Sequence, residues 1–343
     1  MEVRMKLERG INFGGWLSQC NHTKERYDSF ISKKDVERVK GWGFDHIRLP
    51  FDYNVIENAD GSEKQTGYVY LDNMVSWCAE YGLNLILDLH KAAGYDFNDA
   101  GDTEKNSLFN DEKLKLKFVS LWEKVAKKYG SYTHVAFELL NEVVEQDLAS
   151  LWNSLISRTV SAVRKHAPVT KIIYGGIQWN SARTVKLLDK PSDENIIFTF
   201  HFYEPLIFTH QKAPWVPNII MDRDVNYPGT MEYFIELSKP LGYKGKDVTD
   251  ADKNDKGDSL IREMVKEAKT AAAKYGAQLY CGEFGVIDRA PAEDSLNWFK
   301  DVFTIFKENN IGSAIWSYKE MDFGIIDDHY KPIRDELLSV YVK

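Results

Sequence analysis

The chain has 343 residues, 43% of them hydrophobic and 28% charged, so it can bury a large core, and long disordered stretches are not expected. Its net charge of −8 and the lack of a dominant basic cluster argue against nucleic acid as a partner and favour a neutral substrate. No apolar run approaches membrane-spanning length, so no membrane partner is expected either.

Eight short segments rich in β-branched and aromatic residues are predicted to be strands. In chain order they are Ile11–Gly15, Phe44–Pro50, Leu83–His90, His134–Asn141, Lys171–Gly175, Ile196–Tyr203, Gln278–Glu283 and Ser313–Tyr318. The third and the sixth are almost continuously apolar, which is typical of parallel strands that are covered on both faces.

Amphipathic segments lie between these strands. The clearest is Asp147–His166, whose apolar residues recur at spacings of three and four. Asp111–Tyr129 and Asp258–Tyr275 each begin with an aspartate that can cap a helix, and Ala292–Asn309 and Pro332–Tyr341 complete the series. The alternation predicts an α/β fold, a single (β/α)8 TIM barrel that spans residues 1–343. An open doubly wound sheet would usually carry a Gly-rich phosphate turn, and none with that spacing follows the first strand.

One connection is much longer than the others. Residues 204–257 separate the sixth strand from the sixth helix, and we expect them to form an inserted subdomain over the active-site cleft. This segment contains Phe208, Trp215, Tyr227, Tyr233, Phe234 and Tyr243. Most of these aromatic residues are expected to form a small core, and Trp215 is the first candidate to reach the cleft.

Polar and aromatic residues stand at the C-terminal ends of six predicted strands, the rim at which the active sites of such barrels lie. They are Arg48, Asp88, His90, Asn141, Glu142, His201, Tyr203, Glu283 and Trp316. A single residue of this kind is often structural, because buried charged residues are usually paired within the core. The convergence of all of them on one rim predicts a catalytic site.

Glu142 and Glu283 stand at the ends of the fourth and seventh strands, which face each other across a barrel. Hydrolysis of a glycoside needs one protonated carboxyl and one carboxylate, about 5–5.5 Å apart in enzymes that retain the anomeric configuration. We therefore expect Glu283 to be the nucleophile and Glu142 the acid/base, although either alone could equally be a buried structural carboxylate. Arg48 can keep Glu283 ionised, and Tyr203 can orient it.

The remaining residues of the rim are suited to hold a sugar. Asn141 can donate a hydrogen bond to the 2-hydroxyl, and His90 can bond another ring hydroxyl. His201 is placed to touch the acid/base or the substrate. Trp316 can stack against the apolar face of a sugar on the non-reducing side of the cleaved bond.

Together these motifs resemble glycoside hydrolase family 5, the cellulase family. The family pattern has Arg on strand two, His on strand three, Asn-Glu on strand four, His-x-Tyr on strand six, Glu on strand seven and Trp on strand eight, and the residues named above match it in that order. Segments such as Phe137–Glu142 and Cys281–Gly285 look like those of clostridial endoglucanases with a comparable insertion. Two positions depart from the pattern: Val143 stands where the family often has Pro, and Lys91 stands where many members have a second His.

The resemblance implies a retaining endo-β-1,4-glucanase that acts on soluble β-1,4- or mixed-linkage β-glucans, with an endo-β-mannanase or glucomannanase as the alternative. Further candidates for stacking on sugars are Trp16, Trp179, Phe208 and Trp215. Neither a cofactor nor a metal is implied. The expected partner is a polysaccharide or oligosaccharide, and a monomer is expected.

Two other classes of function compete with this one. A metal-dependent hydrolase would use the two histidines and two glutamates of the rim as ligands, but no H-E-x-x-H motif is present and Arg48 would oppose a cation. A non-catalytic sugar-binding barrel would typically lack one of the glutamates. A partial calcium-loop pattern from Asp252 to Glu263 has Lys256 at a ligand position, which disfavours calcium.

The cysteines and the N-terminus bear on the cellular compartment. Cys20, Cys78 and Cys281 are odd in number and widely spaced, so neither a disulfide framework nor a metal site is expected. Residues 1–10 are charged and lack the apolar core of a signal peptide. The location stays open between a secreted enzyme, or a module of one, whose leader was removed and a cytoplasmic enzyme.

Overall fold

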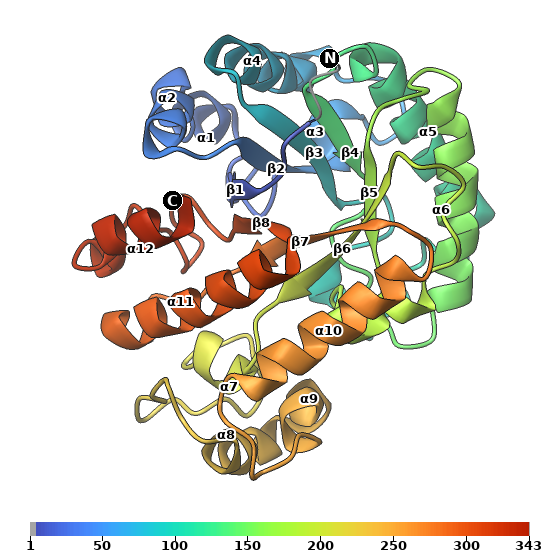
Figure 1. Cartoon of the computed structure of the whole chain (residues 1–343). Coiled ribbons are helices and arrows are strands. Elements are labelled where there is room, and N and C mark those ends of the chain that lie inside the picture. The colour runs from blue at the N-terminus through green and yellow to red at the C-terminus, as the bar shows by residue number, and fades with distance from the viewer. Residues whose placement is uncertain (1–4, 343) are drawn as a thin grey trace.

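Eight parallel strands close into a barrel in chain order in the computed structural model, which describes residues 5–342 (Figure 1). The strands are β1 (Arg9–Asn12), β2 (His46–Asp52), β3 (Asn84–Lys91), β4 (Val135–Glu138), β5 (Ile172–Gly175), β6 (Ile196–Phe202), β7 (Gln278–Phe284) and β8 (Gly312–Ile315). Each strand overlaps a segment predicted from the sequence, and the (β/α)8 barrel is confirmed.

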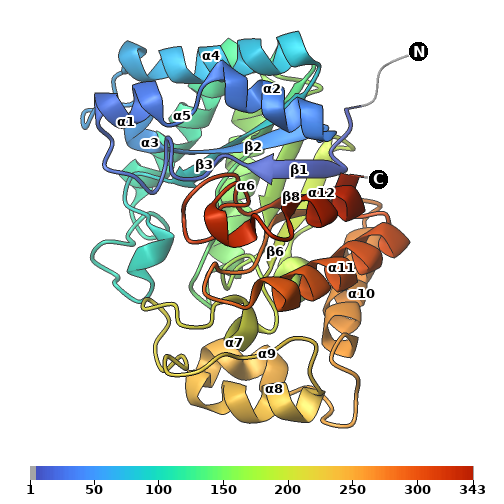
Figure 2. The same cartoon turned by 90° about the vertical axis from the view of Figure 1, so that its left-hand side faces the viewer.

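Helices surround the barrel (Figures 1 and 2). The α-helices are α1 (Lys24–Ser29), α2 (Lys33–Trp42), α3 (Tyr53–Ile56), α4 (Gln65–Tyr81), α5 (Glu112–Tyr129), α6 (Ala149–Arg164), α7 (Leu206–Thr209), α8 (Met231–Ser238), α9 (Lys246–Thr249), α10 (Ser259–Ala273), α11 (Ala292–Asn309) and α12 (Arg334–Val342). The 3₁₀ helices are η1 (Phe97–Asp99), η2 (Ala182–Leu187), η3 (Lys239–Gly245) and η4 (Asp328–Tyr330). Among the helices within residues 5–342, none combines the length and the apolar character needed to cross a membrane.

The two predicted aspartate caps have different outcomes. The Asp111 carboxylate accepts a hydrogen bond from the backbone N–H of Lys113 at 2.7 Å and caps α5 as predicted. The predicted cap of α10 is wrong, because the Asp258 carboxylate accepts from Arg262 Nε at 3.0 Å instead. An ion pair four residues along the helix has thus replaced the bond to the backbone.

The barrel interior is filled in two layers. Because successive residues of a strand point to opposite faces, Ile86 and Asp88 of β3 lie on the same face, as do Ala136 and Glu138 of β4. The layer nearer the N-terminal ends of the strands is an apolar cluster of Leu7, Ile86, Ala136, Ile173, Ile197, Tyr280 and Ala314. The charged and amide side chains of the rim stand on this apolar floor.

β4 is shorter than predicted, since it ends at Glu138 rather than at Asn141. The next residues still bond to both neighbouring strands: Leu139 N donates to Ile173 O at 3.0 Å, and Asn141 N donates to Leu89 O at 3.0 Å. These bonds hold Asn141, and with it the next residue Glu142, at the rim.

Segment 204–257 contains α7, α8, η3 and α9. α8 and α9 lie at one edge of the molecule, below α10 in Figure 1 and below the barrel in Figure 2. Buried Phe208 packs against Tyr227, and Tyr227 against Phe234, with ring centroids 5.2 and 6.0 Å apart. Arg183 of η2 ties the segment to the barrel wall, because its guanidinium lies 2.9 Å from the carboxylate of Asp247 in α9.

Candidate active site

Arg48 of β2 is the centre of the polar layer and is completely buried. Its guanidinium makes a two-pronged ion pair with Glu138, with N–O distances of 2.7 and 3.0 Å. Its Nη1 also donates to Glu283 Oε1 at 2.7 Å. A cation is buried at acceptable cost only with such partners, and here they also fix the plane of the guanidinium.

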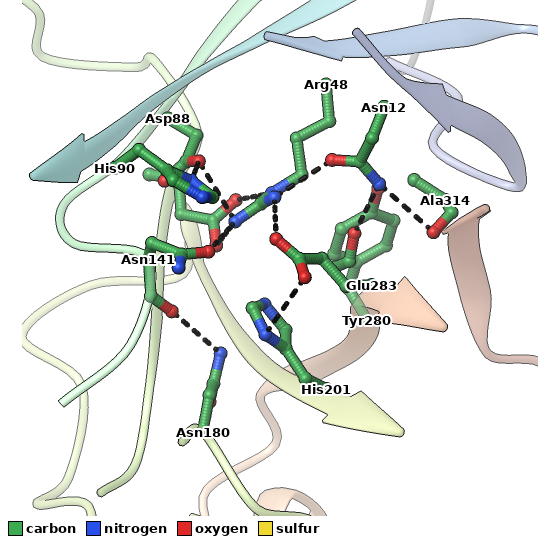
Figure 3. A network of polar contacts seen from close by, with 12 residues as sticks. Asn12, Arg48, Asp88, His90, Asn141, Asn180, His201, Tyr280, Glu283 and Ala314 are labelled. Atoms are coloured by element: carbon green, nitrogen blue, oxygen red, sulfur yellow. Dashed lines mark hydrogen bonds and ion pairs between the residues drawn. The ribbon is translucent and has the colours of Figure 1, made fainter. Parts of the chain in front are cut away.

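Two amides and a third acidic residue complete the shell around Arg48 (Figure 3). Nη1 donates to Asn12 Oδ1 at 2.9 Å, and Nη2 donates to Asn141 Oδ1 at 2.8 Å. Asp88 Oδ2 lies 3.1 Å from Nη2. Because Asn141 accepts through its oxygen, its amide N–H groups face away from Arg48 and can donate to a ligand.

Glu283, on β7, is held by two donors. Arg48 donates to its Oε1, and the Tyr203 hydroxyl donates to its Oε2 at 2.9 Å. Burial raises the pKa of Glu283, whereas the charge of Arg48 and the bond from Tyr203 oppose that rise. These two donors favour the ionised form, which is the form in which a carboxylate acts as a nucleophile.

Glu142 faces Glu283 within the same site. Its Oε1 lies 2.7 Å from His201 Nδ1. His201 Nδ1 also lies 3.7 Å from Glu283 Oε2 (Figure 3). Oxygen atoms of the two carboxylates lie within 4.8 Å of each other. Burial, and then the negative charge of Glu283, raise the pKa of Glu142 well above its ordinary value. Because Arg48 bonds to Glu283, these surroundings favour the proton on Glu142 over Glu283.

His90 is fixed in one tautomer on the other side of the site. Its Nδ1 lies 2.6 Å from Asp88 Oδ2, and its Nε2 lies 3.0 Å from Gln19 Nε2. Because an amide nitrogen is a donor, His90 Nε2 accepts and Nδ1 carries the proton. Burial lowers the pKa of His90 to about 4, so the ring is neutral at pH 7. The ring is stacked on Trp316, with centroids 5.6 Å apart and planes 2° from parallel.

The donor atoms of Glu142, His201 and Glu283 lie close enough to hold a metal ion, all within 4.8 Å of one another. A cation at this point would sit beside Arg48, whose positive charge already bonds to Glu283. The donor set therefore fits acid–base chemistry by two carboxyls better than it fits a metal site. In the partial calcium loop, Glu263 is bonded to Arg183 at 3.1 Å, which occupies the carboxylate that calcium would need.

The four additional candidates for stacking on sugars divide into two groups. Trp16 and Phe208 are buried, at 1% and 0% exposure, so the structure contradicts their prediction as stacking surfaces. Trp16 donates its indole N–H to Tyr27 O and packs on Trp77, so it belongs to the core. Trp179 is half-buried and Trp215 is 48% exposed, so both keep a surface that a ligand can reach.

The profile of Cellulase (glycosyl hydrolase family 5) matches residues 10–322 of this sequence. The chain belongs to glycosyl hydrolase family 5. It is 40% identical to Endoglucanase C of Acetivibrio thermocellus over 344 residues, which cover 99% of each chain. It is also 40% identical to Cellodextrinase A of Ruminococcus flavefaciens, over 88% of this chain and 83% of that one.

Solved structures agree with this family assignment at the level of the fold. The cellulose synthase subunit Z (CcsZ) of Clostridioides difficile superposes with a TM-score of 0.78 at 24% identity, over 98% of this chain and all of that one. Endoglucanase Cel5A of Thermotoga maritima superposes with a TM-score of 0.76 at 23% identity, over 98% and 97% of the two chains.

The sequence did not single out three residues that the structure places in the site. Glu138 and Asn12 bond directly to Arg48, and Gln19 bonds to His90. Glu138 carried a usable signal, since it is a charged residue inside a short apolar strand and shares a face with Ala136. Gln19 carried none, because it lies in a loop with a positive φ of 51°.

Proposed function

We propose that this family 5 glycoside hydrolase is an endo-β-1,4-glucanase that cleaves soluble β-glucans by double displacement, with retention of configuration. The proposal rests on one observation: the carboxyls of Glu142 and Glu283 lie close together but have different surroundings. Glu283 accepts hydrogen bonds from the Arg48 guanidinium and the Tyr203 hydroxyl. Glu142 instead contacts His201. Burial lowers the pKa of that histidine, His201, well below its ordinary value, so it brings no positive charge to Glu142.

In the first step the Glu283 carboxylate attacks the anomeric carbon, and the bond from that carbon to the leaving oxygen breaks. Glu142 gives its proton to the leaving oxygen and becomes a carboxylate. In the second step Glu142 takes a proton from water, the water oxygen attacks the anomeric carbon, and the bond to Glu283 breaks. The closeness of the two carboxyls supports retention, because inverting enzymes hold them about 6.5–9.5 Å apart to admit a water.

The other residues of the site take supporting roles in this proposal. Asn141 donates to the sugar 2-hydroxyl. Because His90 Nδ1 bonds to Asp88 and Nε2 to Gln19, His90 bonds a second hydroxyl through Nε2 when the sugar displaces the Gln19 amide. Trp316 stacks on the sugar whose anomeric carbon reacts. The names of the two relatives at 40% identity, an endoglucanase and a cellodextrinase, support a chain of β-1,4-linked glucose as the substrate.

The first test is proton NMR of fresh product from barley β-glucan or a cello-oligosaccharide. The β-anomer at early times is expected, and the α-anomer would mean inversion and a wrong mechanism. Product from mannan but not from glucan would move the substrate to the mannanase alternative. If no product formed from any β-glucan or β-mannan, the result would favour the alternative of a non-catalytic sugar-binding barrel.

The second test separates the two glutamates. Glu283→Ala is expected to lose most turnover and to regain part of it with azide, which forms a glycosyl azide of inverted configuration. An azide product of retained configuration would exchange the roles of Glu142 and Glu283.

A further inference from the structure

A strained turn next to the acid/base positions Trp179. Gln178, Trp179 and Asn180 follow one another with φ angles of 56°, 55° and 57°, a conformation that side chains other than glycine rarely adopt. Backbone strain of this kind persists only where surrounding bonds over-determine it, and it is concentrated at functional sites.

The bonds that hold this turn lead to the catalytic residues. Trp179 N donates to the carbonyl of Val143, the residue after Glu142, at 3.1 Å. Asn180 O accepts from the backbone N–H of His201 at 2.8 Å. The turn is therefore built against the loop of the acid/base, and Trp179 lies on the Glu142 side of the site, whereas Trp316 lies on the His90 side.

A lysine from segment 204–257 completes this surface. Lys244 of η3 is half-buried, and its ammonium nitrogen lies 5.1 Å from the centroid of the Trp179 ring. Within residues 5–342 the structure gives Lys244 no ion pair, and the carboxyl whose charge acts on it is Glu142. Arg183 of η2, four positions after Trp179, contacts Asp247, three positions after Lys244, so the two segments are tied together at this point.

We propose that Lys244 is a specificity-determining residue, whose ammonium group and the Trp179 ring together bind the leaving sugar on the Glu142 side of the cleaved bond. The inference rests on the proposed function. Glu142 protonates the glycosidic oxygen, so the sugar attached to that oxygen lies next to Glu142. A pyranose offers C–H faces to an aromatic ring and hydroxyl oxygens to an ammonium group, and this surface supplies both.

Lys244 also acts on the acid/base itself. Its positive charge lowers the pKa of Glu142, against the larger upward effects of burial and Glu283. Glu142 interacts electrostatically with other charged or titratable groups, namely Arg48, Asp88, Tyr95, Tyr203, Lys244 and Glu283. It is also in direct contact with His201. Of these, Lys244 is the one supplied by η3.

The test compares Lys244→Met with the wild-type enzyme on two substrates. Cellotetraose has a sugar as its leaving group, whereas 2,4-dinitrophenyl β-cellobioside has an activated aryl group that needs neither the ammonium nor a proton. We expect kcat/KM to fall about tenfold on cellotetraose, the scale of one hydrogen bond from a charged donor, and less than about twofold on the aryl substrate. The basic limb of the kcat/KM pH profile on cellotetraose should move to higher pH, because the carboxylate form of Glu142 loses a favourable charge.

Two further variants make the outcome decisive. Lys244→Arg keeps the charge and should retain most activity on cellotetraose. Lys246→Met removes a lysine of the same segment that pairs with Asp250 at the exposed surface, and it should change neither substrate. Equal losses on both substrates, or an unmoved basic limb, would overturn the role of Lys244. Failure of the wild-type enzyme on both substrates would instead overturn the proposed function.

Discussion

At the scale of single residues, the site concentrates negative charge around one cation. Arg48 contacts Asp88, Glu138 and Glu283, so three carboxyls share one guanidinium. Burial raises the pKa of Asp88 and of Glu138 to about 7 each, although Arg48 opposes the rise in both. The arrangement holds Arg48 rigidly in front of Glu283, because each of its partners is itself buried.

Glu138→Gln tests this support without removing volume. One oxygen that accepts from Arg48 becomes an amide nitrogen, so two donors face each other and one buried donor is left unsatisfied. We expect a loss of about 1–3 kcal/mol in the free energy of unfolding, measured in urea, and a clear fall in kcat as Arg48 shifts away from Glu283. Glu336→Gln, in an exposed pair with Lys300, is the control and should cost less than about 1 kcal/mol. Unchanged stability and kcat in Glu138→Gln would mean that Arg48 is held by its other partners alone.

His22 provides a pH-dependent contribution to stability. Its Nε2 lies 3.0 Å from Asp52 Oδ2, and this hydrogen bond, followed by the effect of Cys20, raises the pKa of His22 to about 9. A raised folded-state pKa stabilises the protein fully below the unfolded value near 6.5, and this stability is lost as the pH rises from there through 9. The side chain is 26% exposed, so solvent screening reduces the contribution to about 1–2 kcal/mol.

The measurement is the urea midpoint at pH 6 and at pH 9.5 for the wild type and for His22→Asn. Asparagine tolerates the positive φ of 53° at this position and does not titrate. The wild type should lose more stability than the variant between these two pH values. Parallel losses in the two proteins would show that other groups cause the pH dependence.

The residues of the proposed chemistry were easier to predict from the sequence than the residues that surround them. Glu142, Glu283 and His201 lie at or just after the C-terminal ends of their strands, and Arg48 lies within β2. Because the barrel brings these strands together, the convergence of their side chains followed from the order of the elements. Trp16 was wrongly predicted as a stacking surface, because a tryptophan in the core and one in a cleft look alike in a sequence. Lys244 was not found, because no periodic pattern in the sequence places residues 204–257 relative to the barrel.

At the scale of elements, the eight strands were predictable because their apolar runs must be covered on both faces. Their ends were not, because a strand ends where the regular ladder of cross-strand bonds ends, even where single cross-strand bonds continue beyond it. β4 shows this, since Asn141 still bonds to Leu89 but lies beyond the last regular strand residue. The packing of helices on one another could not be predicted from the sequence either, because it depends on atoms that come close only in the folded structure.

Two glycines within helices test how closely the helices pack on one another. A Cβ added at Gly67 of α4 would lie 1.6 Å from the carbonyl oxygen of Val55 in α3, whereas a Cβ at Gly41 of α2 would meet nothing within 4 Å. Gly67→Ala should therefore destabilise the protein by about 1–3 kcal/mol, because α3 must move. Gly41→Ala should stabilise it by up to about 1 kcal/mol, because alanine restricts the unfolded chain and favours the helix. Thermal unfolding of both variants checks the pair, and effects of the same sign would contradict this account.

At the scale of the whole molecule, segment 204–257 is joined to the barrel wall by one cation with several partners. Arg183 of η2 contacts Asp247 of α9, and also Glu263 and Glu267 of α10. The guanidinium thus links segment 204–257 to the helix that follows it and to the turn that carries Trp179. A link of this kind predicts a fixed wall beside the cleft rather than a lid that opens freely.

Arg183→Met removes the link while it keeps much of the side-chain volume. We expect amide hydrogen exchange in η3 and α9 to become about 5–30-fold faster, which corresponds to a loss of about 1–2 kcal/mol in the free energy of local opening. Exchange in the barrel strands should change little, because none of the Arg183 partners lies on a strand. Arg262→Met is the matched control, since the ion pairs that Arg262 makes within residues 5–342 go to Asp258 and to Glu308 of α11, both outside the segment. If Arg262→Met accelerated exchange in α9 as much as Arg183→Met, the segment would be held by α10 as a whole rather than by Arg183. If neither variant did, the aromatic packing of Phe208 and Tyr227 would be sufficient to fix it.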